Sequence, residues 1–143
     1  MVKIYKTARV EYTCEQMFNL VADVNHYREF VLYCSDSRVM SETDKMVRAY
    51  LEFSLGGFKQ KFSTVNQLYP HEKITMKLEE GPFKYLDGLW TFEAVGDSSC
   101  NVSLHIQYEI SSSIVNMILG PIFSQTAHQL VFTFTDRAKK VYG

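Results

Sequence analysis

The sequence predicts an α+β domain in which a curved antiparallel sheet of about seven strands is covered by a long C-terminal helix. Three observations indicate this fold. Segments of alternating polar and apolar residues, most of them joined by hairpin turns, fill the chain between about residues 34 and 110. Two short helical patterns precede these segments, and a long helical pattern follows them. At 143 residues, the whole chain is expected to form one domain, residues 1–143.

The N-terminal residues predict one strand and two short helices. Residues 2–11 alternate apolar and polar side chains, as a strand does. Thr13 is a typical helix N-cap, and Gln16 stands three residues later, where it completes a capping box. We therefore expect a helix over residues 14–22 and a second short helix over residues 24–30.

The middle of the chain has the pattern of an antiparallel meander with one solvated face and one apolar face. The adjacent residues Gly56 and Gly57 have the composition of a hairpin turn, and Pro70, Gly81 and Gly96 mark the turns that follow. We expect six strands in this part of the chain, near residues 34–42, 47–54, 58–68, 74–78, 86–92 and 102–110.

The C-terminal residues predict two consecutive helices. Ser111–Ser113 can cap the first, and apolar residues then recur at helical spacing until Gly120 and Pro121 interrupt them. We expect a short helix over 112–119 and a long one over 121–141, with an axis of about 30 Å. A strongly curved sheet wrapped around such a helix leaves space that side chains fill only in part. We therefore expect an internal apolar cavity.

Composition and charge exclude several classes of protein. With 46% hydrophobic and 14% aromatic residues, the chain is not expected to be disordered. No stretch reaches the ~18 apolar residues of a membrane-spanning helix. Fifteen Lys and Arg against sixteen Asp and Glu give a formal charge of -1, which argues against non-specific nucleic-acid binding, and no DNA partner is expected. The three cysteines, Cys14, Cys34 and Cys100, do not form a disulfide framework, which favours reduced thiols inside a cell.

The polar residues offer no catalytic or metal-binding constellation. The four histidines, at positions 26, 71, 105 and 128, lack the spacing of metal ligands. Glu79 and Glu80 are adjacent in a strand, so their carboxylates point to opposite faces. Cys34 is expected to be a small packed residue and not a nucleophile. We therefore predict that the chain is not an enzyme and has no catalytic residue and no metal, and we place its function in the apolar interior.

Three segments carry a resemblance to a known family. In chain order they are VADVNHYREFVLYC (residues 21–34), GPFKYLDGLWTFE (residues 81–93) and FTFTDRAKKVYG (residues 132–143). They resemble signature segments of the coenzyme-Q-binding subfamily of the START-like superfamily, which also holds polyketide cyclases; the subfamily includes bacterial ribosome association toxins of the RatA type. Arg28 and Leu32 stand where members usually have prolines. The resemblance implies the helix-grip fold, in which a curved sheet holds a long helix over a ligand cavity.

The resemblance implies a non-enzymatic protein that binds ubiquinone or a related polyprenyl lipid and supports respiration or quinone biosynthesis. The alternative is a regulator that binds the large ribosomal subunit and blocks subunit association. A polyketide cyclase or aromatase is the lower alternative, because it needs acid/base groups that this interior supplies poorly. The expected partners are a hydrophobic small molecule, the large ribosomal subunit and, transiently, a membrane surface. No cofactor is expected apart from a ubiquinone-like lipid as bound ligand.

The expected ligand-binding residues are apolar side chains that face the cavity, together with polar groups that can hydrogen-bond a quinone ring. Tyr27, Asn66 and Tyr108 are the candidate hydrogen-bonding groups. The full set is Tyr27, Phe53, Phe62, Asn66, Met76, Leu78, Trp90, Phe92, Tyr108, Phe123, Ala127, Leu130 and Phe134.

The C-terminal residues Arg137, Lys139 and Lys140 form a candidate docking patch for anionic lipid headgroups or ribosomal RNA. The alternative is a solvated helix end favoured by the helix dipole. One of Val131 and Phe132 is expected to be exposed at the cavity mouth, as a lid or membrane contact. The expected location is the bacterial cytoplasm, with the surface of the inner membrane as an alternative and the mitochondrion only if a presequence has been removed.

Overall fold

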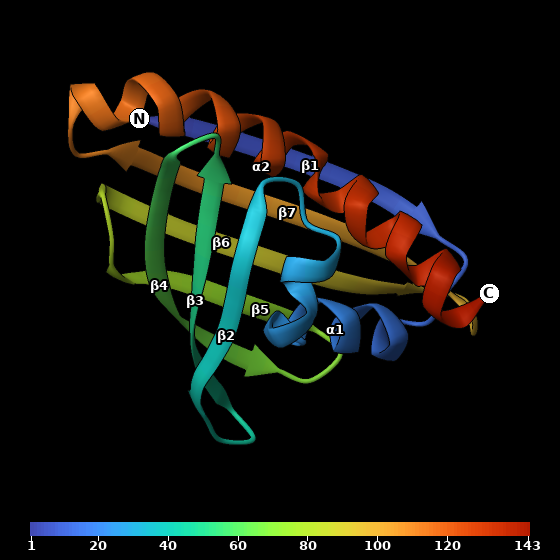
Figure 1. Cartoon of the computed structure of the whole chain (residues 1–143). Coiled ribbons are helices and arrows are strands. Elements are labelled where there is room, and N and C mark those ends of the chain that lie inside the picture. The colour runs from blue at the N-terminus through green and yellow to red at the C-terminus, as the bar shows by residue number, and fades with distance from the viewer.

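The computed structural model describes all 143 residues and consists of one sheet, two α-helices and one short 3₁₀ helix (Figure 1). This confirms the α+β fold and the seven strands predicted from the sequence. The elements are β1 (Val2–Val10), α1 (Cys14–Ala22), η1 (Val24–Glu29), β2 (Cys34–Glu42), β3 (Met46–Leu55), β4 (Phe58–Tyr69), β5 (Lys73–Glu80), β6 (Phe83–Val95), β7 (Ser99–Ile110) and α2 (Ser113–Tyr142).

All seven strands form one antiparallel sheet in the order β1-β7-β6-β5-β4-β3-β2. From β2 to β7 each strand pairs with the next one in the chain, as the hairpin turns predict, and β1 pairs with β7 so that Ile4 lies opposite Ile106. The sheet curls strongly, so that in Figure 1 β2, β3 and β4 cross in front of β6 and β7. α2 packs on β1 and β7, α1 on β6 and β7, and η1 on β2.

The predicted capping box sets the start of α1. The Thr13 hydroxyl accepts the backbone N–H of Gln16 at 3.1 Å, and the Gln16 side chain accepts the backbone N–H of Thr13 at 2.9 Å. These two bonds satisfy N–H groups that the first turn of a helix leaves free. Met17 and Phe18 then turn into the core. The segment that follows is a 3₁₀ helix, one residue shorter than the predicted helix over residues 24–30.

The C-terminal region corrects the prediction of two helices, because α2 is continuous through Gly120 and Pro121. Proline has no N–H, so the carbonyl of Met117 loses its intrahelical donor. Both Met117 and Pro121 lie on the exposed side of the helix, where water can replace that donor. Gly120 has no Cβ to clash with the proline ring, and the burial of Leu119 and Ile122 holds the helix together across the proline. None of the helices is both long and apolar enough to cross a membrane.

Two aromatic residues anchor α2 in the core. The ring of Phe123 lies 4.5 Å from the ring of Tyr108 in β7. The ring of Phe134, which is fully buried, lies 5.2 Å from Tyr27 in η1 and 5.4 Å from Trp90 in β6. The two anchors are eleven positions apart in the helix, which is about 16 Å along the axis. The space for a ligand lies beneath this span.

Candidate functional site

A cavity of about 70 Å³, measured as the space that the centre of a water molecule can occupy, lies between the concave face of the sheet and α2. It exists because small residues stand on both walls. Thr126 and Ala127 place short side chains between the two aromatic anchors of α2. On the sheet, Gly88 leaves room for the side chain of Met76, whose methyl carbon lies 2.4 Å from the place that a Cβ at Gly88 would take.

The wall of the cavity is apolar and uncharged. Fourteen of its eighteen residues are hydrophobic, and none is Asp, Glu, His, Lys or Arg. A charged ligand would lose its hydration there without gaining a counter-charge, so the cavity suits an uncharged, largely apolar molecule.

Two polar groups of the wall are already engaged by the protein. The Tyr27 hydroxyl donates to the backbone carbonyl of Val21, and burial raises the pKa of this hydroxyl, which keeps it protonated. The Thr126 hydroxyl donates to the carbonyl of Ile122, one turn earlier in α2, at 2.8 Å. Neither hydroxyl therefore has a free proton to give to a ligand.

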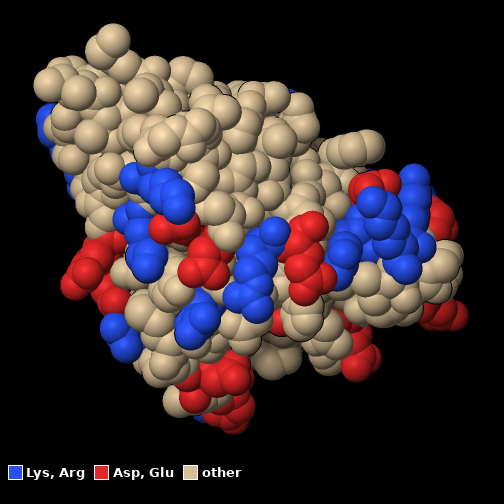
Figure 2. All heavy atoms as spheres, viewed as in Figure 1, with Lys and Arg blue, Asp and Glu red and all other residues tan.

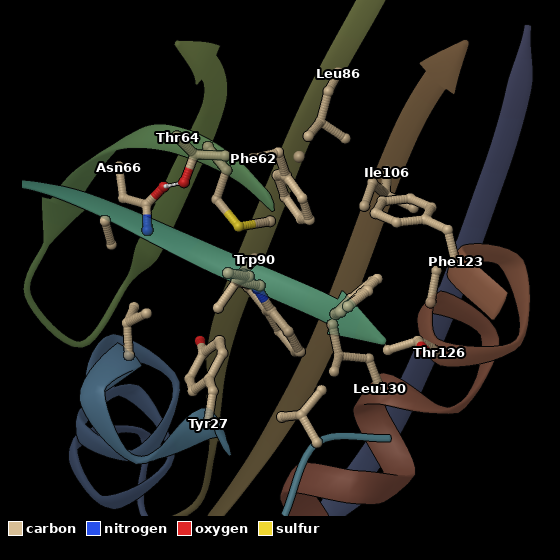
Figure 3. Close-up of a pocket in the computed structure, with 18 residues that line it drawn as sticks. Tyr27, Phe62, Thr64, Asn66, Leu86, Trp90, Ile106, Phe123, Thr126 and Leu130 are labelled. Carbon is tan, nitrogen blue, oxygen red and sulfur yellow. Dashed lines mark hydrogen bonds between the residues drawn. The ribbon is translucent and has the colours of Figure 1, made fainter. Parts of the chain in front are cut away.

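Two nitrogen donors remain for a ligand. The Thr64 hydroxyl donates to Oδ1 of Asn66 at 2.8 Å, which turns the amide nitrogen of Asn66 toward the cavity (Figure 3). Neither this nitrogen nor the indole nitrogen of Trp90 has a hydrogen-bond partner in the protein, and neither is fully shielded from the cavity. Because both nitrogens are open to the cavity and carry N–H groups, they can donate to oxygen acceptors of a ligand that enters it.

The structure brings nine of the predicted ligand-binding residues together on the wall. They come from η1, from four strands of the sheet and from α2. These nine are Tyr27, Phe53, Phe62, Asn66, Met76, Trp90, Phe123, Ala127 and Leu130.

The other four predicted residues lie outside the wall. Phe92 is stacked with Trp90, at 6.4 Å between ring centroids, and meets Phe18 edge-on, at 5.7 Å. Tyr108 lies against Phe123 and Phe134 against Trp90, so both support wall residues without facing the space themselves. Leu78 lies next to a register shift between β4 and β5 and close to Gly81.

The wall also contains residues that the sequence analysis missed. Most of them share strand alternation with a predicted residue: Leu51 lies two positions from Phe53, and Thr64 lies between Phe62 and Asn66. This periodicity could have identified them. The remaining residues are Val24, Val31, Ala49, Leu86, Gly88, Ile106 and Thr126. Val24 and Val31 had no such signal, because their position depends on the path of the chain around η1.

These features agree with a match at the level of the family. Residues 10–135 match the family described as polyketide cyclase / dehydrase and lipid transport. The chain belongs to this family. The seven-stranded sheet, the long helix and the cavity between them are therefore the form that this polyketide cyclase / dehydrase and lipid transport domain takes here.

Among relatives, the chain is 39% identical over 140 residues to the ribosome association toxin RatA of Pseudomonas aeruginosa, covering 98% of this chain and 97% of that protein. A more distant relative is the mitochondrial coenzyme Q-binding protein COQ10 homolog B of Xenopus laevis, at 25% identity over 92% of this chain and 56% of that protein. The crystal structure of the Zhui aromatase/cyclase of Streptomyces sp. R1128 superposes with a TM-score of 0.85 over 99% of this chain and 96% of that one, at 12% identity, a likeness of fold.

The three segments that carry the family resemblance meet inside the domain. The first contributes Tyr27, the second Trp90 and the third Phe134, and the last ring contacts both of the others. Arg28, which the resemblance places at a usual proline position, supports the chain path through hydrogen bonds. Its backbone N–H donates to the hydroxyl of Ser37 at 3.0 Å, a bond that proline cannot make, and its guanidinium donates to the Ser37 carbonyl at 3.0 Å.

The candidate docking patch is less open than the sequence suggests. Arg137 is only 23% exposed, because its guanidinium pairs with Glu29 at 3.1 Å and lies 4.7 Å from the centre of the Phe30 ring. Lys140 pairs with Asp136 one turn earlier in α2, at 3.5 Å. Lys139 is exposed and has no carboxylate partner. The two lysine side chains remain accessible to a large anionic partner, whereas the Arg137 side chain is engaged by Glu29 and Phe30.

The surface over α2 is otherwise uncharged. No Asp, Glu, Lys or Arg occurs between Glu109 and Asp136. Figure 2 shows the result: charged side chains lie across the lower part of the view and near the C-terminal end of α2, and the surface over the rest of the helix has almost none. Of the two predicted lid residues, Phe132 is 69% exposed and Val131 is buried, and neither belongs to the cavity wall.

Proposed function

We propose that this protein is a non-enzymatic, cytoplasmic regulator that associates with the large ribosomal subunit. The observation that carries the proposal is the 39% identity to a ribosome association toxin over nearly the full length of both chains. Because the match covers 97% of that relative, the activity in its name does not depend on a domain outside the matched region. Lys139 and Lys140, at the charged end of α2, are the proposed contacts to ribosomal RNA.

The test is co-sedimentation of the purified protein with isolated large subunits at several salt concentrations. We expect binding that weakens steeply with salt, because each phosphate contact releases a counterion. The double variant Lys139→Glu, Lys140→Glu should bind at least tenfold more weakly. The matched control reverses two exposed lysines at hairpin ends, Lys45→Glu and Lys59→Glu, and should bind as the unchanged protein does. Absence of binding at low salt would contradict the proposal.

We also propose that the cavity holds an uncharged apolar ligand with carbonyl oxygens, of which a polyprenyl quinone such as ubiquinone is an example. The unpartnered nitrogens of Asn66 and Trp90 support this proposal, because a quinone ring offers two acceptors and its isoprenoid tail needs only apolar walls. Burial of the tail contributes about 0.8 kcal/mol per CH₂. Native mass spectrometry with lipid extraction, on protein from a quinone-containing bacterium, should detect a bound quinone.

The two proposals are compatible, and their tests separate them. Protein stripped of lipid that still binds the large subunit would place the ribosome contact outside the cavity. Protein that stays empty after incubation with quinones would contradict the ligand proposal alone. We propose no cyclase activity, because the wall has no carboxylate, imidazole or amine to move a proton.

A further inference from the structure

Two cysteines that do not line the cavity lie in contact where the start of α1 meets β7. Sγ of Cys14 and Sγ of Cys100 are 3.0 Å apart, although the residues are 86 positions apart in the chain. All three cysteines are free thiols, and Cys34 lies beside the backbone of Asp36 and not beside another sulfur. The three cysteines are far apart in the sequence, and the fold brings two of them, Cys14 and Cys100, into contact.

The two thiols have unlike surroundings. Cys100, near the start of β7, is fully buried, and burial raises the pKa of its thiol to about 12. Cys14 is the first residue of α1 and is partly exposed. An oxidant in solution therefore reaches Cys14 first, and Cys100 is the only thiol within contact distance to react with an oxidised Cys14.

We propose that Cys14 and Cys100 form a reversible oxidation site that responds to hydroperoxides. Cys14 attacks the peroxide oxygen, the O–O bond breaks, and one molecule of water (or an alcohol) leaves, so that Cys14 becomes a sulfenic acid. The sulfur of Cys100 then attacks the sulfur of Cys14. Its proton and the sulfenic hydroxyl leave as a second water, and a disulfide remains. The peroxide is the oxidant, and a dithiol reductant restores both thiols.

The geometry permits this bond with a small movement. A disulfide needs its sulfurs at about 2.05 Å, so the two atoms must approach by about 1 Å. Cys14 stands at the end of its helix, where one side-chain rotation and a slight shift of the first turn supply that distance. The bond would join α1 to β7. α1 is already held from outside by Tyr142, whose hydroxyl donates to the carbonyl of Gln16 at 2.9 Å.

The test is treatment of the native protein with hydrogen peroxide, followed by alkylation and peptide mapping without reduction. We expect a cross-linked pair of peptides that contain Cys14 and Cys100, an intact mass lower by two hydrogen atoms, and an upward shift of the thermal unfolding midpoint that dithiothreitol reverses. The Cys34→Ser variant should behave in the same way, and Cys14→Ser should lose both the cross-link and the shift.

Three results would overturn the proposal. The first is a cross-link that involves Cys34. The second is a disulfide between two molecules. The third is oxidation of Cys14 beyond sulfenic acid with Cys100 still free to be alkylated after unfolding. Because Cys14 is partly exposed, Cys14→Ser should fold, and circular dichroism of that variant verifies that a lost cross-link does not reflect a lost fold.

Discussion

The indole of Trp90 stands at 87° to the ring of Phe134, with the ring centroids 5.4 Å apart. Trp90 comes from β6 and Phe134 from α2, so this edge-on contact joins the sheet to the helix at one end of the cavity. Phe134 lies behind the wall, whereas Trp90 belongs to it and keeps its N–H free. Trp90 therefore contributes both to the stability of the core and to the surface that a ligand meets.

Replacement of Trp90 by phenylalanine should separate these two contributions. Trp90→Phe keeps a ring against Phe134 but removes the N–H, so we expect the affinity for a quinone to fall about tenfold, the effect of one hydrogen bond worth about 1.4 kcal/mol. Phe92→Leu is the control, because Phe92 packs behind Trp90 and does not line the cavity. It should lower stability with little change in affinity. Calorimetric titration with a short-tailed quinone measures the affinity of each variant. Equal affinities in Trp90→Phe and the unchanged protein would remove Trp90 from the site.

The orientation of the Asn66 amide should depend on Thr64. Thr64→Val removes the hydroxyl that donates to Asn66 Oδ1, so the amide can rotate and we expect a several-fold loss of quinone affinity. Asn66→Leu removes the donor itself and should lower the quinone affinity about tenfold. If Thr64 acts only through Asn66, the double variant should bind no more weakly than Asn66→Leu. Additive losses in this double-mutant cycle would show instead that Thr64 contacts the ligand.

Stability should depend on pH through His26. Its Nδ1 lies 2.6 Å from the Asp23 carboxylate, and this hydrogen bond, with the charges of Asp23 and Glu29, raises the pKa of His26 above its ordinary value of 6.5. The folded state therefore favours the protonated ring. Its contribution to stability is complete below about pH 6.5 and is lost as the pH rises through the raised value.

Urea denaturation between pH 5.5 and about pH 9 measures this effect. The difference in unfolding free energy between the unchanged protein and His26→Gln should shrink as the pH rises. His128→Gln is the matched control, because His128 is an exposed histidine of α2 without an acidic partner. At a single pH, this exposed substitution should change the unfolding free energy by no more than about 0.5 kcal/mol. A His26→Gln difference that is constant with pH would contradict the prediction.

Arg137 should contribute to stability and not to ribosome binding. Arg137→Gln loses the ion pair with Glu29 and the contact with the Phe30 ring, which together are worth about 1 kcal/mol. Lys139→Gln removes an exposed side chain and should leave stability unchanged within error. Thermal or urea unfolding of the two variants makes the comparison. A larger stability loss for Lys139→Gln than for Arg137→Gln would contradict our assignment.

Much of this fold could be predicted from local sequence, because the signals that define it are local. Alternation located every strand except β2, and Thr13 with Gln16 located the start of α1. The break predicted at Gly120 and Pro121 was wrong for a reason that is not local. The apolar residues on either side of the proline are buried against the sheet, and this burial outweighs the loss of one hydrogen bond.

The cavity was predictable in its general position but not in its depth. Alternation shows which face a residue occupies, and it correctly placed Tyr108 and Trp90 on the same side of the sheet. It does not show that Phe123 covers Tyr108, or that Trp90 remains open to the cavity. The contact between Cys14 and Cys100 could not be predicted either. It depends on where α1 lies on the sheet, and no spacing pattern in the sequence indicates that position.

The continuity of α2 has a mechanical consequence. Two helices with a joint at Pro121 could pivot separately, so that one end of the cavity could widen while the other stayed closed. A single helix transmits displacement along its length like a rod. Its anchors, Phe123 and Phe134, are about 16 Å apart on that rod, so a ligand that pushes against one end of α2 should also alter the packing around Tyr27 and Trp90 at the other.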